Sequence, residues 1–159
     1  MLKQRIQWTF PFIAVLALLA AVVFAVQDAS AASQKVFTGL VKGVAVGGHD
    51  PVAYFSDGKP MRGKQSISFN YNGALWRFSS EANRSLFAAD PAKYAPQYGG
   101  YCAWAVSQGY TAKGDPAAWS VADGKLYLNY SLEVRNTWNK NIPGNIAKAD
   151  ANWPQVLEK

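Results

Sequence analysis

Two stretches of the chain alternate hydrophobic and polar residues around a two-residue turn. The first covers residues 66–78 with Asn72-Gly73 at its centre, and the second covers residues 118–130 around Asp123-Gly124. Alternation of this kind is typical of half-buried strands, and Asn-Gly and Asp-Gly favour the type I′ turn of tight hairpins. The pattern therefore predicts two antiparallel β-hairpins.

A two-residue turn also fixes which residues face each other across a hairpin. The expected pairs are Tyr71 with Ala74, Phe69 with Trp76 and Ile67 with Phe78 in the first hairpin, and Val121 with Leu126 and Trp119 with Leu128 in the second. In each hairpin these side chains share one face, which we expect to be buried.

Residues that commonly begin helices follow both hairpins. Ser80 and Ser131 are suitable N-caps, Asp90-Pro91 predicts a further short helix, and a last helix is expected around residues 143–152, ending before Pro154. The order predicts an α+β fold in which a small antiparallel sheet, built from the two hairpins, is covered by helices. We find no internal repeat and no Gly-rich phosphate loop, which argues against a nucleotide-binding sheet.

The N-terminus has the pattern of a secretory signal peptide. Lys3 and Arg5 precede an uncharged stretch from Phe12 to Val26, and Ala29-Ser30-Ala31 supplies the small residues of a cleavage site. The stretch is short for a bilayer-spanning helix, which needs about 20 apolar residues. We therefore expect residues 1–31 to be removed and the protein to be periplasmic or secreted, with membrane attachment only if this segment is retained.

Composition is that of a folded domain. Half of the 159 residues are hydrophobic, 14% are aromatic, and 16 Lys and Arg stand against 10 Asp and Glu. The basic residues are scattered rather than grouped, so no nucleic-acid partner is expected. A single cysteine excludes a disulfide framework and an all-thiolate zinc site within one chain.

Several short motifs, in order, resemble the YHS domain family, whose relatives include the TRASH metal-sensing modules. They are Asp50-Pro51-Val52, Tyr71-Asn72-Gly73, residues 76–80, Phe87, Asp90-Pro91 and Tyr94. The resemblance covers roughly residues 47–98. It suggests a lead-in over residues 32–46 and a YHS-like domain over residues 47–159 with a C-terminal helical extension.

The resemblance also implies metal handling, often of copper or zinc, through three cysteines. The corresponding positions in this chain are Ala53, Ser79 and Asn83, and none of them carries a thiol. The fold is therefore expected to transfer, whereas this metal site is not.

Two other hypotheses follow from the chemistry of single residues. Cys102, His49 and Met61 would suit a soft metal ion, copper or zinc, if the loops that carry them meet. Alternatively, Cys102 packs as a small buried hydrophobe and His49 is an ordinary loop residue. A Cys–His nucleophile would need an oriented third group that the sequence does not provide, so we expect no enzyme.

Aromatic residues are densest after the first hairpin and helix. Tyr98, Tyr101, Trp104, Tyr110 and Trp119, together with Gly99 and Gly100, could line a site for a small molecule or a cell-wall glycan, or could belong to the core. The sequence thus predicts an exported, non-enzymatic binding module whose ligand is either a soft metal ion or a small organic molecule.

Overall fold

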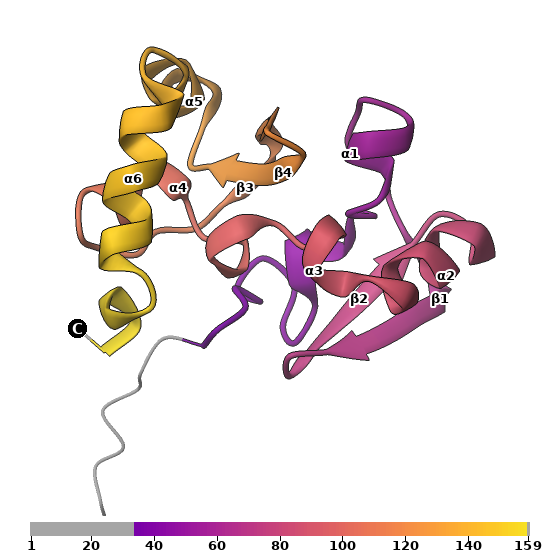
Figure 1. The fold of residues 1–159 in the computed structure, drawn as a ribbon. Helices are drawn as coiled ribbons and strands as arrows, with labels where there is room; N and C mark the ends of the chain where they lie inside the picture. Colours follow the sequence, from indigo (N-terminus) through magenta and orange to yellow (C-terminus); the bar gives the residue numbers. More distant parts are fainter. Residues whose placement is uncertain (1–33, 159) are drawn as a thin grey trace, which may run out of the picture.

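The computed structural model describes residues 34–158 (Figure 1). The expected signal segment, residues 1–31, lies outside the described residues. Among the residues described, no helix has the length and apolar character that crossing a bilayer requires.

The first half of the described chain forms one hairpin flanked by short helices. Its elements are η1 (Ala45–Gly48), α1 (Ala53–Ser56), β1 (Lys64–Tyr71), β2 (Ala74–Phe78), α2 (Glu81–Ala89) and α3 (Pro91–Tyr94). We call residues 45–94 the first unit.

The second half repeats this order of elements. Its elements are η2 (Gln97–Gly100), α4 (Ala103–Ser107), β3 (Asp115–Ala122), β4 (Lys125–Asn129), α5 (Leu132–Asn139), α6 (Ile142–Asn152) and η3 (Gln155–Glu158). We call residues 97–158 the second unit; Figure 1 shows the first unit on the right and the second on the left.

The two hairpins have the same register, with every paired residue of the second lying 51 positions after its counterpart in the first. Both also contain the same irregularity, in which three residues on the first strand have no partner on the second. The pairs on either side of it are Lys64–Phe78 and Ser68–Arg77 in the first hairpin, and Asp115–Asn129 and Trp119–Leu128 in the second.

The backbone before each hairpin is also repeated. Val46-Gly47-Gly48 has φ angles of 51°, 57° and 82°, and Tyr98-Gly99-Gly100 has 55°, 62° and 82°. The residue after each Gly-Gly pair forms an isolated β-bridge with a basic residue. His49 pairs with Arg62, and Tyr101 pairs with Lys113. The expectation that the chain has no internal repeat is therefore wrong, because the repeat lies in the backbone while the side chains at equivalent positions differ.

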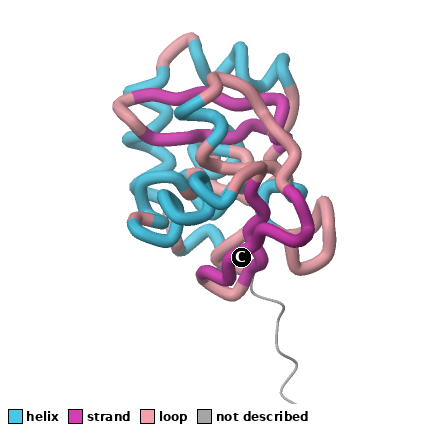
Figure 2. Tube along the Cα trace, turned by 90° about the vertical axis from the view of Figure 1, so that its right-hand side faces the viewer, coloured by secondary structure: helices cyan, strands magenta, loops and turns pink. Residues whose placement is uncertain are grey.

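Two details of the predicted sheet are also wrong. The hairpins form two separate two-stranded sheets instead of one (Figure 2). Phe78 pairs with Lys64 and not with Ile67, because the irregularity in β1 shifts the register beyond Ser68. The other four expected pairs are confirmed, as is the α+β class.

The predicted helix starts are confirmed by their caps. Ser80 accepts a hydrogen bond from the Asn83 amide, Ser131 accepts one from the Val134 amide, and Asp90 caps α3. Each cap satisfies an amide that would otherwise have no partner in the first turn.

Strand β4 joins the units because both of its faces are buried. Leu126 and Leu128 pack into the core of the first unit, around Trp76 and Phe87, while Tyr127 packs into the core of the second, around Trp138. Successive side chains of a strand point to opposite faces, so β4 alone contributes to two cores. The two units are therefore one interlocked structure.

The lead-in is fixed where the units meet. Val36 is buried, the Phe37 amide donates to the Gly99 carbonyl over 2.9 Å, and the Tyr101 hydroxyl donates to the Gln34 carbonyl over 2.8 Å. Within the described part of the lead-in, β-pairing consists of isolated bridges at Val44. The lead-in is held by the η2 turn, whose conformation requires glycine at position 99.

We predict that Gly99→Ala destabilises the protein more than Gly58→Ala. Both glycines have a φ of 62°, so both variants incur the left-handed backbone cost of about 1 kcal/mol. A methyl group at position 99 would overlap the Lys35 carbonyl, whereas nothing lies within 4 Å of one at position 58. Overpacking should add about 1–3 kcal/mol for Gly99→Ala in urea unfolding. Equal losses in the two variants would contradict this packing of the lead-in.

Candidate functional site

A buried aspartate begins the Asp50-Pro51-Val52 motif. Asp50 is fully buried, and its carboxyl oxygens accept hydrogen bonds from the amides of Val52 at 2.9 Å and Ser79 at 2.8 Å. One side chain therefore joins the η1 turn, the start of α1 and the end of β2.

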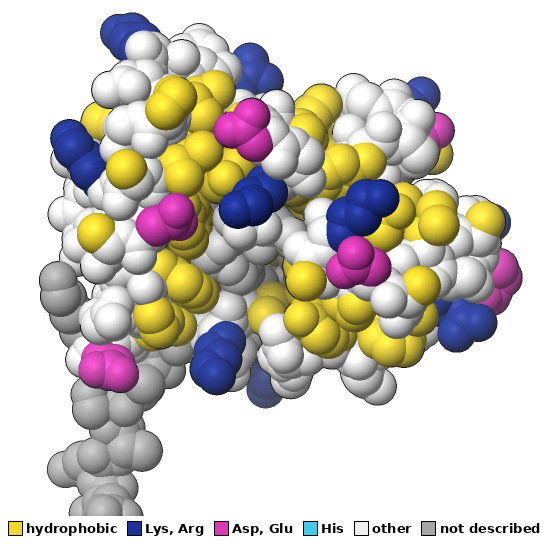
Figure 3. Space-filling view, in the orientation of Figure 1, with side chains coloured by type: hydrophobic (Ala, Val, Ile, Leu, Met, Phe, Trp, Pro, Cys, Tyr) yellow, Lys and Arg dark blue, Asp and Glu magenta, His cyan; other side chains and the backbone are white. Residues whose placement is uncertain are grey.

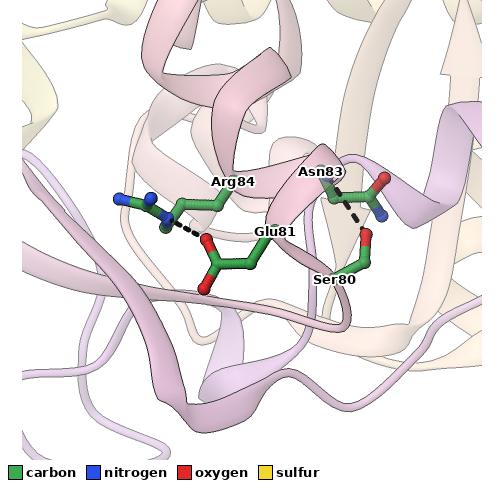
Figure 4. Close-up of polar contacts among 4 residues, drawn as sticks. All are labelled: Ser80, Glu81, Asn83 and Arg84. Atoms are coloured by element: carbon green, nitrogen blue, oxygen red, sulfur yellow. Dashed lines mark hydrogen bonds and ion pairs between the residues drawn. The ribbon is translucent and has the colours of Figure 1, made fainter.

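Ser79 and Asn83, two of the positions at which the resemblance implies cysteines, complete this cluster. The Ser79 hydroxyl and the Asn83 amide each donate to Asp50 Oδ2, both over 2.7 Å, and the Asn83 amide also lies 3.3 Å from Ser79 Oγ. Figure 4 shows Asn83 one turn into α2, beyond the Ser80 cap, with the Glu81–Arg84 ion pair beside it. We call Asp50, Ser79 and Asn83 the polar cluster.

The polar cluster does not fit a thiolate metal site. Ala53, the third position, is a buried methyl group, and Ser79 and Asn83 use their donor groups on Asp50. Hydrogen bonds thus make the connections that metal–thiolate bonds would make. No site of the implied kind can form at these three positions.

Cys102 occupies in the second unit the place that Asp50 has in the first. Both follow the Gly-Gly turn, and both precede a short helix. The Cys102 amide donates to the Ala112 carbonyl, as the Asp50 amide donates to Met61. The Cys102 sulfur accepts from the Ala105 amide at 3.4 Å and lies 3.9 Å from Asn129 Oδ1.

Burial dominates the chemistry of this thiol. Cys102 is 1% exposed, and desolvation raises its pKa above the ordinary value, although the backbone amides of Ala105, Tyr130 and Trp104 act in the opposite direction. A buried thiol with a raised pKa is a poor nucleophile. The interpretation of Cys102 as a packed, structural residue fits these contacts.

His49 and Met61 lie in the first unit. His49 is half-buried, and its Nδ1 lies 3.1 Å from the Val46 carbonyl of its own turn. Burial lowers the pKa of His49, and the positive charge of Arg62 adds to this effect. Within residues 34–158 no group of three or more His, Cys, Asp and Glu could hold a metal ion. The predicted ligand set of Cys102, His49 and Met61 includes a methionine, a residue type outside those four, and it stays a prediction.

The aromatic residues expected to form one cluster are divided among three places. Tyr98 and Tyr101 both contact the Trp153 ring, with centroids 5.8 and 6.2 Å away. Trp104 and Tyr110 line a cavity in the second unit, and Trp119 packs against Tyr54. Gly100, with its φ of 82°, belongs to the buried η2 turn.

A cavity of about 310 Å³ lies where the two units and the lead-in meet. We call it the junction pocket. Four aromatic side chains line it, Tyr71, Trp76, Tyr98 and Trp153. On the face drawn in Figure 3, the surface is hollowed between the units, with hydrophobic side chains on both sides.

Polar groups surround these rings. Lys35, Asn72 and Gln97 also line the junction pocket, and the Tyr98 hydroxyl donates to Asp150 over 2.8 Å. Burial and the Asp150 carboxylate raise the pKa of Tyr98 well above its usual range, so the hydroxyl stays protonated. Aromatic walls with a few polar groups at the rim are typical of sites for small organic ligands.

Sequence reasoning identified only part of this pocket. Tyr98 and Gly99 were expected to bind a ligand and do line it, whereas Tyr71 and Trp76 were assigned to the buried face of the hairpin and Trp153 was not expected at a ligand site. Lys35 was not singled out. No local pattern joins these residues, because they meet only when the second unit returns to the first.

Comparison with known proteins gives one family. Residues 52–98 match the family model described as the YHS domain. No curated protein and no solved structure matches the chain. The matched segment begins two residues after Asp50 and ends within η2, so it covers the first unit from Val52 onward and includes Ser79 and Asn83, but not η1 or Asp50.

We predict that Asp50→Ala lowers the free energy of unfolding by about 3 kcal/mol or more, because several buried or half-buried donors lose their acceptor. Asp50→Asn keeps the shape of the side chain but turns an amide donor toward other donors. Its free energy of unfolding should lie between those of Asp50→Ala and the wild type. The matched control is Asp57→Ala, an exposed aspartate with one exposed hydrogen bond, which should change stability by less than about 0.5 kcal/mol. Similar losses at positions 50 and 57 would refute the organising role of Asp50.

We predict that Cys102 resists thiol reagents in the folded protein. Because its pKa is raised and its sulfur is buried, labelling by a disulfide reagent at pH 8 should be slow in buffer and rapid in denaturing urea. Ser66→Cys in a Cys102→Ala background, which places a thiol on an exposed strand position, provides the reactive control. Rapid labelling of native Cys102 would show an accessible, reactive thiol instead.

Proposed function

We propose that the protein, whose residues 52–98 match the YHS domain, is an exported, non-enzymatic binding module that holds a small organic molecule in the junction pocket. A fragment of a cell-wall glycan is the ligand class we favour. The observation that carries the proposal is the set of four aromatic side chains around one cavity of about 310 Å³.

The chemistry of the pocket suits a sugar. The apolar faces of pyranose rings pack on aromatic rings, and Trp153 and Tyr71 are half-buried, so each keeps part of its ring available. Asn72 and Gln97 supply amide donors and acceptors for hydroxyl groups, and Lys35 supplies a positive charge for an acidic substituent. A basic protein outside the cytoplasm would meet such polymers.

Export and the absence of catalysis are part of the proposal. Export is supported by the charged start, apolar stretch and small cleavage residues within residues 1–31. The raised pKa of the Cys102 thiol and its use in packing argue against a nucleophilic role.

A soft metal ion is the second ligand, since YHS domains are generally associated with metal binding. Burial lowers the pKa of His49, so its imidazole is neutral at pH 7, as a metal ligand must be. Cys102 would have to leave its contacts with Ala105 and Asn129 to join it. For this reason we favour the organic ligand over the metal ion.

We predict that a disaccharide muropeptide quenches tryptophan fluorescence of the purified protein with saturation. Trp153→Ala should weaken binding roughly tenfold, as expected for loss of an aromatic anchor. Tyr110→Ala, which removes an exposed aromatic ring outside this pocket, is the matched control and should bind normally.

A Cys102→Ser variant distinguishes the organic ligand from the metal ion. Cys102→Ser should leave muropeptide binding unchanged, and stoichiometric uptake of Cu(I) or Zn(II) that this variant loses would favour the metal ion instead. A flat muropeptide titration, or equal weakening by Trp153→Ala and Tyr110→Ala, would contradict the proposed site.

A further inference from the structure

The second unit contains a cavity at the place where the first unit has its polar cluster. This cavity measures about 290 Å³ and is lined by Cys102, Trp104, Tyr110, Tyr130 and Val134, together with two alanines. We call it the thiol pocket. In the repeat, Cys102 corresponds to Asp50, Tyr130 to Ser79 and Val134 to Asn83.

All three positions of the polar cluster have apolar or weakly polar side chains in the second unit. Three residues that hydrogen-bond to one another in the first unit are replaced by a thiol, a phenol ring and an isopropyl group in the second. The cluster fills its site with hydrogen bonds, whereas the thiol pocket leaves a cavity. Its volume exceeds the roughly 150 Å³ of an apolar cavity that holds a benzene ring.

Two aromatic side chains that line the thiol pocket, and one leucine close to them in the chain, are exposed. Tyr110 is 52% exposed and Tyr130 is 48% exposed. Leu132, two residues after Tyr130, is 49% exposed. Position 132 corresponds to the charged Glu81 of the first unit. Exposed apolar groups beside a cavity are typical of ligand-binding surfaces.

A cation lies beside Tyr130, one of the side chains that line the thiol pocket. The Lys113 ammonium lies 5.0 Å from the centre of the Tyr130 ring, and it makes no ion pair with any residue of the described part of the chain. Its counterpart Arg62 is used differently, since it donates to the Gly47 carbonyl over 2.9 Å. The second unit thus has an apolar cavity with a free positive charge at its edge.

We propose that the thiol pocket binds a small apolar carboxylic acid, with the hydrocarbon part inside the cavity and the carboxylate at Lys113. Hydrocarbon of this size is desolvated by Trp104, Val134 and the rings of Tyr110 and Tyr130, and the carboxylate stays at the exposed rim where Lys113 lies. The site is separate from the junction pocket and does not rest on the function proposed for that pocket.

Naphthalene-2-carboxylate is the probe, and naphthalene-2-methanol is its uncharged counterpart. In the purified full chain, titration followed by amide chemical shifts should move the signals of Ala105, Ala112 and Tyr130, and the carboxylate should bind more tightly than the alcohol. Lys113→Gln should weaken the carboxylate roughly threefold, the size of an exposed ion pair, and leave the alcohol unchanged.

The double variant Tyr130→Ser, Val134→Asn gives the pocket the residues of the first unit. It should weaken both probes about tenfold or more, because polar groups would have to lose water on binding. Leu86→Ala, an exposed leucine of the first unit, is the control and should bind normally, as should Trp153→Ala in the junction pocket.

Circular dichroism and urea unfolding of each variant check that it is folded; if the double variant is not, Val134→Asn alone takes its place with the same expected direction. Absence of binding at millimolar probe, binding that survives the variants, or shifts confined to the junction pocket would each overturn the proposal.

Discussion

Each half of the molecule depends on one buried acceptor that follows a Gly-Gly turn. In the first unit the acceptor is the Asp50 carboxyl, and in the second it is the Cys102 sulfur. From this position one side chain reaches the amides at the start of a short helix and at the end of the hairpin. It adds to the other contacts between these parts, such as the hydrogen bond from the Gly63 amide to the Gly48 carbonyl and the hydrophobic core of the unit.

The choice of acceptor decides what each unit has in its interior. A carboxyl group needs several donors when it is buried, and Ser79 and Asn83 supply them, so the first unit is closed by hydrogen bonds. A thiol makes no such demand, and the second unit has Tyr130 and Val134 around a cavity at the same place. The family match covers residues 52–98, whereas the second half of the chain has a similar order of elements with different side chains at the equivalent place.

Local chemistry in the sequence was enough to predict most of the elements. Asn72-Gly73 and Asp123-Gly124 fix their turns, and Ser80 and Ser131 cap their helices, because each of these effects involves neighbours in the chain. Tertiary effects were missed: the register shift in β1, the burial of both faces of β4, and the aromatic walls that Trp76 and Trp153 bring to the junction pocket. The repeat was missed because its positions share backbone conformation and few side chains.

Hydrogen exchange of the Ser79 and Tyr130 amides tests the organising role of the two acceptors most directly. The amide of Ser79 donates to Asp50, and that of Tyr130 acts to lower the pKa of the Cys102 thiol, the effect expected of an amide that donates to the sulfur. If these bonds hold the units together, both amides should exchange only through unfolding of the whole molecule, with protection close to its global stability. Exchange as rapid as that of the exposed Asn72 turn would show that the acceptors do not organise the fold.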